Sequence, residues 1–130
     1  MPGVIETQLD RERDITIFTV QGDFTAQQAS EVIAVFYDGE PTTHVLWDFS
    51  DATFGNISAG VPQQIAGVAQ QHTDMSRPGG KTALVFTTDI GFGLGRMFGT
   101  FRELQGAATQ YRTFRSRDDA ERWLGADLVE

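Results

Sequence analysis

Histidine and cysteine, which most often serve as metal ligands or nucleophiles, are nearly absent from this chain. It has two histidines, His44 and His72, and no cysteine. Neither histidine has the HExxH spacing of a zinc site or an acidic cluster beside it. Thiolate metal centres, disulfides and cysteine nucleophiles are excluded. We therefore predict no catalytic residue, no metal and no cofactor, and we expect both histidines to be ordinary surface or helix-capping residues.

Two glycine-rich stretches resemble phosphate-binding loops without matching them. Residues 79–82, GGKT, look like the end of a P-loop, but Met75 replaces the first glycine and the stretch precedes a strand. Residues 91–96, GFGLGR, follow a strand and open a helix, as a dinucleotide fingerprint does, but Arg96 replaces the third glycine. We interpret the glycines as helix-packing positions and Arg96 as a candidate anion contact near a helix N-terminus. The chain has no Gly-x-Ser-x-Gly turn for a hydrolytic serine.

The elements that must position any site are organised around the stretch from His44 to Val61. Its apolar run, residues 45–47, indicates a strand that is covered on both faces, as in a parallel sheet. Short polar side chains favour turns, and four of them end the run: Asp48, Ser50, Asp51 and Thr53. Ligands and partners of open α/β sheets dock beyond the carboxyl ends of strands, so we predict that function lies in this loop.

The first half of the chain predicts a hairpin followed by a helix. Residues 4–9 and 15–20 alternate between apolar and polar side chains around a charged run, which is typical of a hairpin with its first strand at the sheet edge. Thr25 and Gln28 have the spacing of a capping box, and the helix that they open is expected to end at residues 38–39, Asp-Gly.

The second half predicts three more helices, which alternate with strands at 82–87 and 111–114. Arg112 suggests that the second of these strands lies at an edge of the sheet. The second helix begins at Ser58 or Val61 and runs to about residue 71. The fourth follows a cap at Ser116. The third contains four glycines, whose low helix propensity requires close packing as compensation. Its expected apolar stripe is Leu94, Met97, Phe98, Phe101 and Leu104.

The predicted element order is ββαβαβαβα with four helices. It indicates an α/β fold with a mostly parallel five-stranded sheet and an antiparallel N-terminal hairpin strand. The 130 residues suit one domain, residues 1–130.

The net charge of −8 makes nucleic acid an unexpected partner. No apolar run is long enough to insert into a membrane, and we expect a cytoplasmic protein. The basic residues near the C-terminus are interleaved with acidic ones, so we interpret that segment as a solvated face with local ion pairs.

With this order and the segment LWDFSDATFGNISAG at residues 46–60, the chain resembles the STAS superfamily, in particular its SpoIIAA-like branch. Anti-sigma factor antagonists of that superfamily carry Asp-Ser-Ser-Gly at the start of the second helix, where a partner kinase phosphorylates the later serine. The matching residues are Asn56, Ile57, Ser58 and Ala59. Since Ser58 alone is retained, the resemblance implies it as the candidate regulatory phosphorylation site. Residues 92–97, FGLGRM, also resemble the SpoIIAA-like branch.

Two functions follow. The first is a non-enzymatic interaction module that binds a protein partner or a second copy, with a homodimer expected. Its candidate face comprises Asp51, Thr53, Phe54, Asn56, Phe92 and Arg96. The second is a carrier of a small apolar or anionic ligand, implied by the similarity of the superfamily to Sec14-like lipid-binding domains. It predicts an apolar cavity of a few hundred Å³ with Arg96 near its mouth. An enzyme is the least supported reading.

Overall fold

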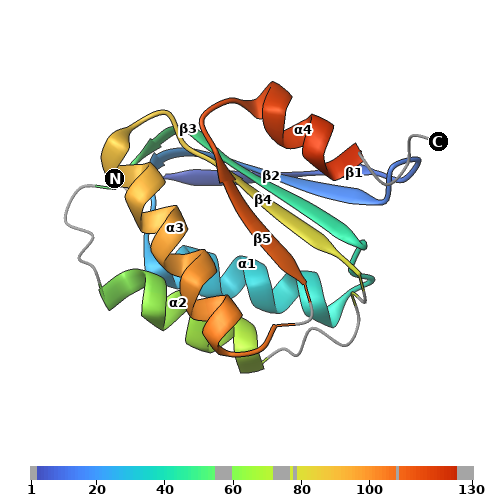
Figure 1. Ribbon diagram of the computed structural model, residues 1–130, viewed down its shortest axis with the longest axis horizontal. Helices are drawn as coiled ribbons and strands as arrows, with labels where there is room; N and C mark the ends of the chain where they lie inside the picture. Colours follow the sequence, from blue (N-terminus) through green and yellow to red (C-terminus); the bar gives the residue numbers. More distant parts are fainter. Residues whose placement is uncertain (1–2, 55–59, 72–76, 78, 108, 126–130) are drawn as a thin grey trace.

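The computed structural model describes residues 3–54, 60–71, 77, 79–107 and 109–125. These residues form nine elements in the predicted order (Figure 1). The strands are β1 (Val4–Asp10), β2 (Ile15–Asp23), β3 (His44–Thr53), β4 (Lys81–Val85) and β5 (Gln110–Phe114). The helices are α1 (Ala26–Asp38), α2 (Gly60–Gln71), α3 (Asp89–Leu104) and α4 (Arg117–Gly125).

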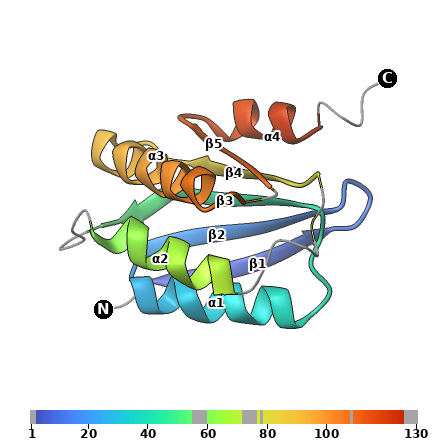
Figure 2. The same ribbon diagram turned by 60° about the horizontal axis from the view of Figure 1, so that its bottom comes forward.

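The five strands form one mixed sheet in sequence order, β1-β2-β3-β4-β5. β1 pairs antiparallel with β2, and every other neighbouring pair is parallel. Figure 2 shows α1, α2 and α3 on one face of the sheet and α4 on the other. The predicted fold class is therefore confirmed, including the edge positions of β1 and β5.

Two hydrophobic cores lie on the two faces of the sheet. The larger core, under α1, α2 and α3, is rich in aromatic side chains. Its centre is a stack in which Phe49 lies parallel to Trp47 at 5.7 Å and to Phe86 at 4.6 Å between ring centroids. The smaller core, under α4, consists of Ile15, Ile17, Leu46, Ala83, Val85, Ala120 and Leu124. Because both faces are covered, β3 and β4 are buried throughout their pairing region, as their apolar runs predicted.

A β-bulge lengthens β3 beyond its predicted end. Thr19 pairs with Asp48 and Gln21 with Asp51, so two residues of β3 oppose the single residue Val20 of β2. The extra residue reverses the alternation of side chains. Val45, Trp47 and Phe49 point into the larger core before the bulge, and Ala52 does so after it. The predicted turn residues Asp48, Ser50, Asp51 and Thr53 therefore belong to the strand, and β2 likewise continues to Asp23.

Helix α3 approaches the sheet through two of its glycines. A Cβ atom at Gly95 would lie 2.3 Å from the Phe86 ring, and one at Gly91 would lie 2.7 Å from the same ring. At Gly93, a Cβ atom would have no neighbour within 4 Å. Close packing therefore explains Gly91 and Gly95, as predicted, but not Gly93.

The predicted apolar stripe of α3 is wrong at its C-terminal end. Leu104 is 78% exposed, whereas Arg102 is buried. The Arg102 guanidinium bonds the Tyr111 hydroxyl and the Gln105 side chain, and it lies over the Tyr111 ring. A buried arginine is tolerated here because its charged nitrogens keep hydrogen-bond partners.

Two caps were predicted correctly. The Thr25 and Gln28 side chains form the capping box of α1, and the Ser116 hydroxyl accepts the backbone N–H of Asp119 at 3.1 Å in the first turn of α4. Gly60 is already helical, so the alternative start of α2 at Val61 is wrong. The alternative at Ser58 lies outside the described residues.

His44 is not the surface residue that was expected. It is buried in β3, and its Nδ1 accepts the backbone N–H of Lys81 at 3.1 Å. The Lys81 ammonium in turn donates to the backbone carbonyl of Trp123. The GGKT stretch thus leads into β4, as its position before a strand predicted. His72 lies outside the described residues.

The glycines of α3 generate a stability test. We expect Gly95→Ala to lower the free energy of unfolding by about 1–3 kcal/mol, because the new methyl group overpacks the core against Phe86. Gly93→Ala, the matched control, meets no neighbour and should raise it by up to about 1 kcal/mol through helix propensity. Urea denaturation measures both. Equal stability of the two variants would contradict the close approach of α3 to Phe86.

Candidate functional site

Parallel pairing brings the carboxyl ends of β2, β3 and β4 to one edge of the sheet. The segments that leave β3 and β4 therefore depart at the same edge, as the sequence predicted. Helix α3 begins there, with Thr88 as its N-cap accepting the backbone N–H of Gly91 at 3.1 Å. We call this edge the rim and define its described residues as Asp23, Asp51, Thr53, Phe54, Thr87, Thr88, Asp89, Ile90, Phe92 and Arg115.

The predicted rim residues on β3 divide between surface and core. Asp51 and Thr53 are exposed, and the Thr53 hydroxyl donates to the Asp23 carboxylate across the β2–β3 pair. Phe54 is half-buried and packs against the rings of Phe49 and Phe86, so most of it belongs to the larger core. Asn56 and Ser58 lie outside the described residues.

The predicted residues on α3 also occupy different environments. Phe92 is half-buried beneath Arg115, whose guanidinium carbon lies 4.3 Å from the ring centroid. Arg115 also pairs with the exposed Asp89 at 2.9 Å. Arg96, two turns into the helix, is exposed and therefore accessible to an anion. Arg115, the residue after β5, thus covers part of the Phe92 ring, so the ring is not fully open to a partner.

Ile90 is the exposed apolar residue of the rim, and sequence reasoning missed it. Its exposed fraction is 72%, although it stands in the first turn of a helix with a buried apolar stripe. Helical spacing did not reveal this exposure, because Ile90 stands four residues before Leu94 and seven before Met97, which places it on the predicted stripe. The exposure of Ile90 was therefore decided by the tertiary packing of the helix.

The rim is acidic. Asp23, Asp51 and Asp89 are all exposed, and Arg115 offsets only Asp89 among them in the described chain. Within the same described ranges, no three histidine or acidic side chains gather closely enough to hold a metal ion. The rim therefore presents separate negative charges and one exposed isoleucine.

An apolar cavity lies between the sheet and the helix layer, behind the rim. Its volume is about 70 Å³, and Trp47, Phe86, Ile33 and Ile65 are among its lining residues. An engineered cavity of about 150 Å³ accommodates benzene, so this one is too small for a lipid chain. Arg96 does not line it. The carrier prediction of a few hundred Å³ with Arg96 at the mouth does not match this cavity.

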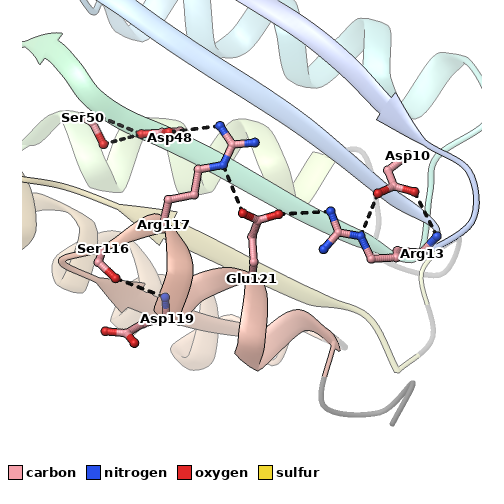
Figure 3. Close-up of polar contacts among 8 residues, drawn as sticks. All are labelled: Asp10, Arg13, Asp48, Ser50, Ser116, Arg117, Asp119 and Glu121. Atoms are coloured by element: carbon pink, nitrogen blue, oxygen red, sulfur yellow. Dashed lines mark hydrogen bonds and ion pairs between the residues drawn. The ribbon is translucent and has the colours of Figure 1, made fainter.

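A chain of alternating charges crosses the opposite face of the sheet (Figure 3). Arg13, in the turn between β1 and β2, bonds Asp10 at 2.7 Å and Glu121 of α4 at 3.1 Å. Arg117 bridges Glu121 at 3.4 Å and Asp48 of β3 at 3.5 Å. The predicted local ion pairs of the C-terminal basic segment are thus present, and they extend to the hairpin and to β3.

The ion pairs change the acidity of two groups in this chain of charges. Hydrogen bonds from Arg13 hold the pKa of Asp10 below its usual range. The hydrogen bond to Asp10 and, to a smaller extent, the one to Glu121 raise the pKa of Arg13. Both shifts favour the charged forms of Asp10 and Arg13, so these two groups stay ionised at neutral pH. The clearest effect of these pairs is to hold the hairpin turn against α4.

Asp48 satisfies the backbone of the β3 bulge. Its Oδ1 accepts the Ser50 backbone N–H at 2.9 Å and the Ser50 hydroxyl at 2.6 Å. Its other oxygen faces Arg117. Both oxygens of this buried carboxylate are engaged, so Asp48 supports the rim rather than acting as a free base.

Comparisons with known proteins identify the fold. No protein-family model matches the chain, and no curated protein matches it in sequence. An uncharacterised protein of the DUF3478 family from Shewanella loihica PV-4, described as having a SpoIIAA-like fold, superposes with a TM-score of 0.58 at 14% identity. The match covers 95% of this chain and 94% of the other. An anti-sigma factor antagonist from Mycobacterium paratuberculosis superposes with a TM-score of 0.56 at 14% identity, covering 93% and 94%.

These likenesses establish a SpoIIAA-like fold, which the sequence resemblance implied. At 14% identity they show the fold alone. None of the described helices is long and apolar enough to span a membrane.

The role of Asp48 gives a second stability test. We expect Asp48→Ala to lower the free energy of unfolding by about 1–3 kcal/mol, because the bulge N–H of Ser50 loses its acceptor. Asp51→Ala, in the same strand, removes the same charge from an exposed site and should change it by no more than about 0.5 kcal/mol. Thermal or urea unfolding compares them. Similar losses in both variants would contradict a specific role for Asp48.

Proposed function

We propose that this chain is a non-enzymatic regulatory module that binds a protein partner through the rim. The observation that carries the proposal is the exposed Ile90 on a rim that also carries the exposed carboxylates of Asp23, Asp51 and Asp89. An isolated apolar side chain within an acidic surface favours a partner with a basic face and a shallow apolar pocket.

The local structure supports a rigid docking face. Thr88, two residues before Ile90, caps α3, and Gly91, the residue after Ile90, packs against Phe86. Arg115 covers Phe92 and pairs with Asp89, so the first turn of the helix is anchored from β5 as well. A surface held in this way loses little conformational entropy when a partner binds.

The structural neighbours are consistent with regulation. One of them is described as an anti-sigma factor antagonist, a name that states a regulatory role. We extend that class of function to this chain as part of the proposal. A cytoplasmic location and a single domain over residues 1–130 also remain predictions.

Ser58 is the proposed regulatory residue of the same module. In sequence it stands between the end of β3 and the start of α2, and the resemblance to antagonist motifs supports it. A phosphate there would add negative charge to the segment that follows β3, a strand whose end is already acidic. The proposed consequence is a change in affinity for a basic partner.

The second candidate is a carrier of a small ligand. The apolar lining of the cavity favours it, whereas the volume of about 70 Å³ disfavours any ligand of lipid size. Native mass spectrometry of the purified chain distinguishes the two functions, because a carrier retains its ligand and an interaction module does not.

Site-specific photo-cross-linking tests the docking face. We expect a benzophenone amino acid in place of Ile90 to form a covalent adduct with one partner protein in the cells that make this chain. The control is the same substitution at Leu104, which lies in the same helix and is similarly exposed, 78% against 72%. Leu104 stands at the opposite end of α3, so it should give no adduct with that partner. Gel shift and mass spectrometry identify the adducts.

Two further variants in the Ile90 background test the chemistry of the partner. Asp51→Lys should reduce the adduct, because it reverses a charge that a basic partner contacts. Ser58→Asp should change its yield if the serine regulates docking. Equal adducts from Ile90 and Leu104, or none from either, would overturn the proposed face.

A further inference from the structure

The outer edge of β1 is the longest unpaired backbone edge in the described sheet. β1 is a terminal strand of seven residues whose other side faces β2. Five of the seven side chains are exposed, including Val4 at 58% and Leu9 at 45%. An edge of this kind offers N–H and C=O groups to a further strand unless proline, lysine or a bulge within it prevents pairing. β1 contains none of these three features.

The side chains of β1 divide between the two faces of the sheet. Ile5, Thr7 and Leu9 share one face, because successive residues of a strand alternate. Ile5 packs against the larger core, so this face continues the helix-covered layer. Val4, Glu6, Gln8 and Asp10 lie on the face that α4 covers elsewhere. An added strand would therefore extend both layers.

A second copy of the same strand has one register that avoids repulsion. A two-fold axis perpendicular to the sheet pairs two β1 strands antiparallel. The axis passes midway between the two copies of one residue, and that residue defines the register. Through Thr7, it pairs all seven residues: Thr7 with Thr7, Ile5 with Leu9, Glu6 with Gln8 and Val4 with Asp10. No acidic side chain then faces another.

The neighbouring registers bring like charges together. An axis through Glu6 places the two Glu6 carboxylates opposite each other, and an axis through Gln8 places Glu6 opposite Asp10 twice. Directly opposed like charges destabilise a strand pair. Registers centred nearer the strand ends leave most of β1 unpaired.

The other sheet edge is less suited to self-pairing. β5 has five residues and carries the exposed Arg112 at its centre. Pairing about that residue would oppose two guanidinium groups. A charge at the centre of an edge strand discourages symmetric pairing, whereas the acidic residues of β1, Glu6 and Asp10, stand away from its centre at Thr7.

We propose that β1 is the dimerisation edge of this protein, where two copies pair antiparallel about Thr7 and form a continuous ten-stranded sheet. The pairing buries Leu9 against Ile5 of the partner and places no like charges directly opposite each other. It goes beyond the rim proposal, because it uses a side edge of the sheet and leaves the carboxyl-end rim of each copy open for a different partner.

Disulfide trapping tests both the dimer and its register. The chain has no cysteine, so a single introduced one gives an unambiguous cross-link. We expect oxidised Thr7→Cys to form a disulfide-linked dimer on a non-reducing gel, since directly opposed residues lie within disulfide reach. Glu6→Cys is the matched control. The Cα atoms of its two cysteines would lie about 8 Å apart in the dimer, so this variant should remain unlinked. A mixture of Glu6→Cys and Gln8→Cys should cross-link.

Two substitutions at Gln8 test the same register without oxidation. Gln8→Lys should tighten the dimer by placing a cation opposite Glu6 of the partner, whereas Gln8→Glu should weaken it. We expect their dissociation constants to differ by at least about fivefold, since each dimer contains two such pairs. Light scattering across a concentration series at physiological salt measures them, because two chains of net charge −8 repel each other at low ionic strength.

The outcomes separate this inference from the rim proposal. A monomer at every concentration, with no Thr7→Cys cross-link, would overturn the dimerisation edge and leave the rim untouched. A dimer that cross-links equally through Glu6→Cys, or that is insensitive to the charge at residue 8, would also overturn it. Loss of the Ile90 adduct with an intact Thr7 cross-link would contradict the rim and retain the edge.

Discussion

The structure depends on the contact between helix α3 and the aromatic stack of the sheet. Phe86 lies parallel to Phe49 in the core, and the glycine face of α3 rests on the Phe86 ring. A side chain at Gly91 or Gly95 would force the helix outward. The rim depends on this contact, because it sets how far the N-terminus of α3, with Ile90 exposed, stands from the ends of β3 and β4.

The bulge in β3 is the second constraint, and it serves the same core. By opposing two residues to Val20, it turns Ala52 into the core and leaves Asp51 in solvent. The bulge also disrupts the local ladder, and the Asp48 carboxylate satisfies the Ser50 N–H. Arg117 and Glu121 of α4 connect Asp48, beside the bulge, to Arg13 in the hairpin turn. Ion pairs of α4 therefore link the bulge near the rim to the opposite end of the sheet.

The two proposed surfaces have different physical origins. The rim arises from parallel pairing, which collects strand ends and a helix start at one edge. The β1 edge arises from the antiparallel hairpin, which leaves one strand with a partner on a single side. Partner binding at the rim and self-association at the side edge therefore occupy separate parts of one scaffold, and one protein can combine both.

The sequence by itself determined the fold class, the element order and the edge strands. Hydrophobic periodicity, the capping pair Thr25 and Gln28, and the doubly buried runs of β3 and β4 are local signals that survive in the tertiary structure. The site was less predictable. Sequence reasoning placed Phe54 and Phe92 on the docking face, but the core and Arg115 cover much of them, while Ile90 is the side chain that is exposed.

Only the tertiary structure decided the ends of β3, the burial of His44 and Arg102, and the exposure of Leu104. Each depends on a partner distant in sequence: β2 opposite the bulge, the Lys81 N–H beside His44, and Tyr111 against Arg102. Polar residues such as Asp48 and Ser50 favour a turn when only their neighbours are considered. In the folded chain, pairing with β2 and the bonds of the buried Asp48 carboxylate to Ser50 and Arg117 stabilise the extended conformation instead. These interactions arise only when the chain has folded.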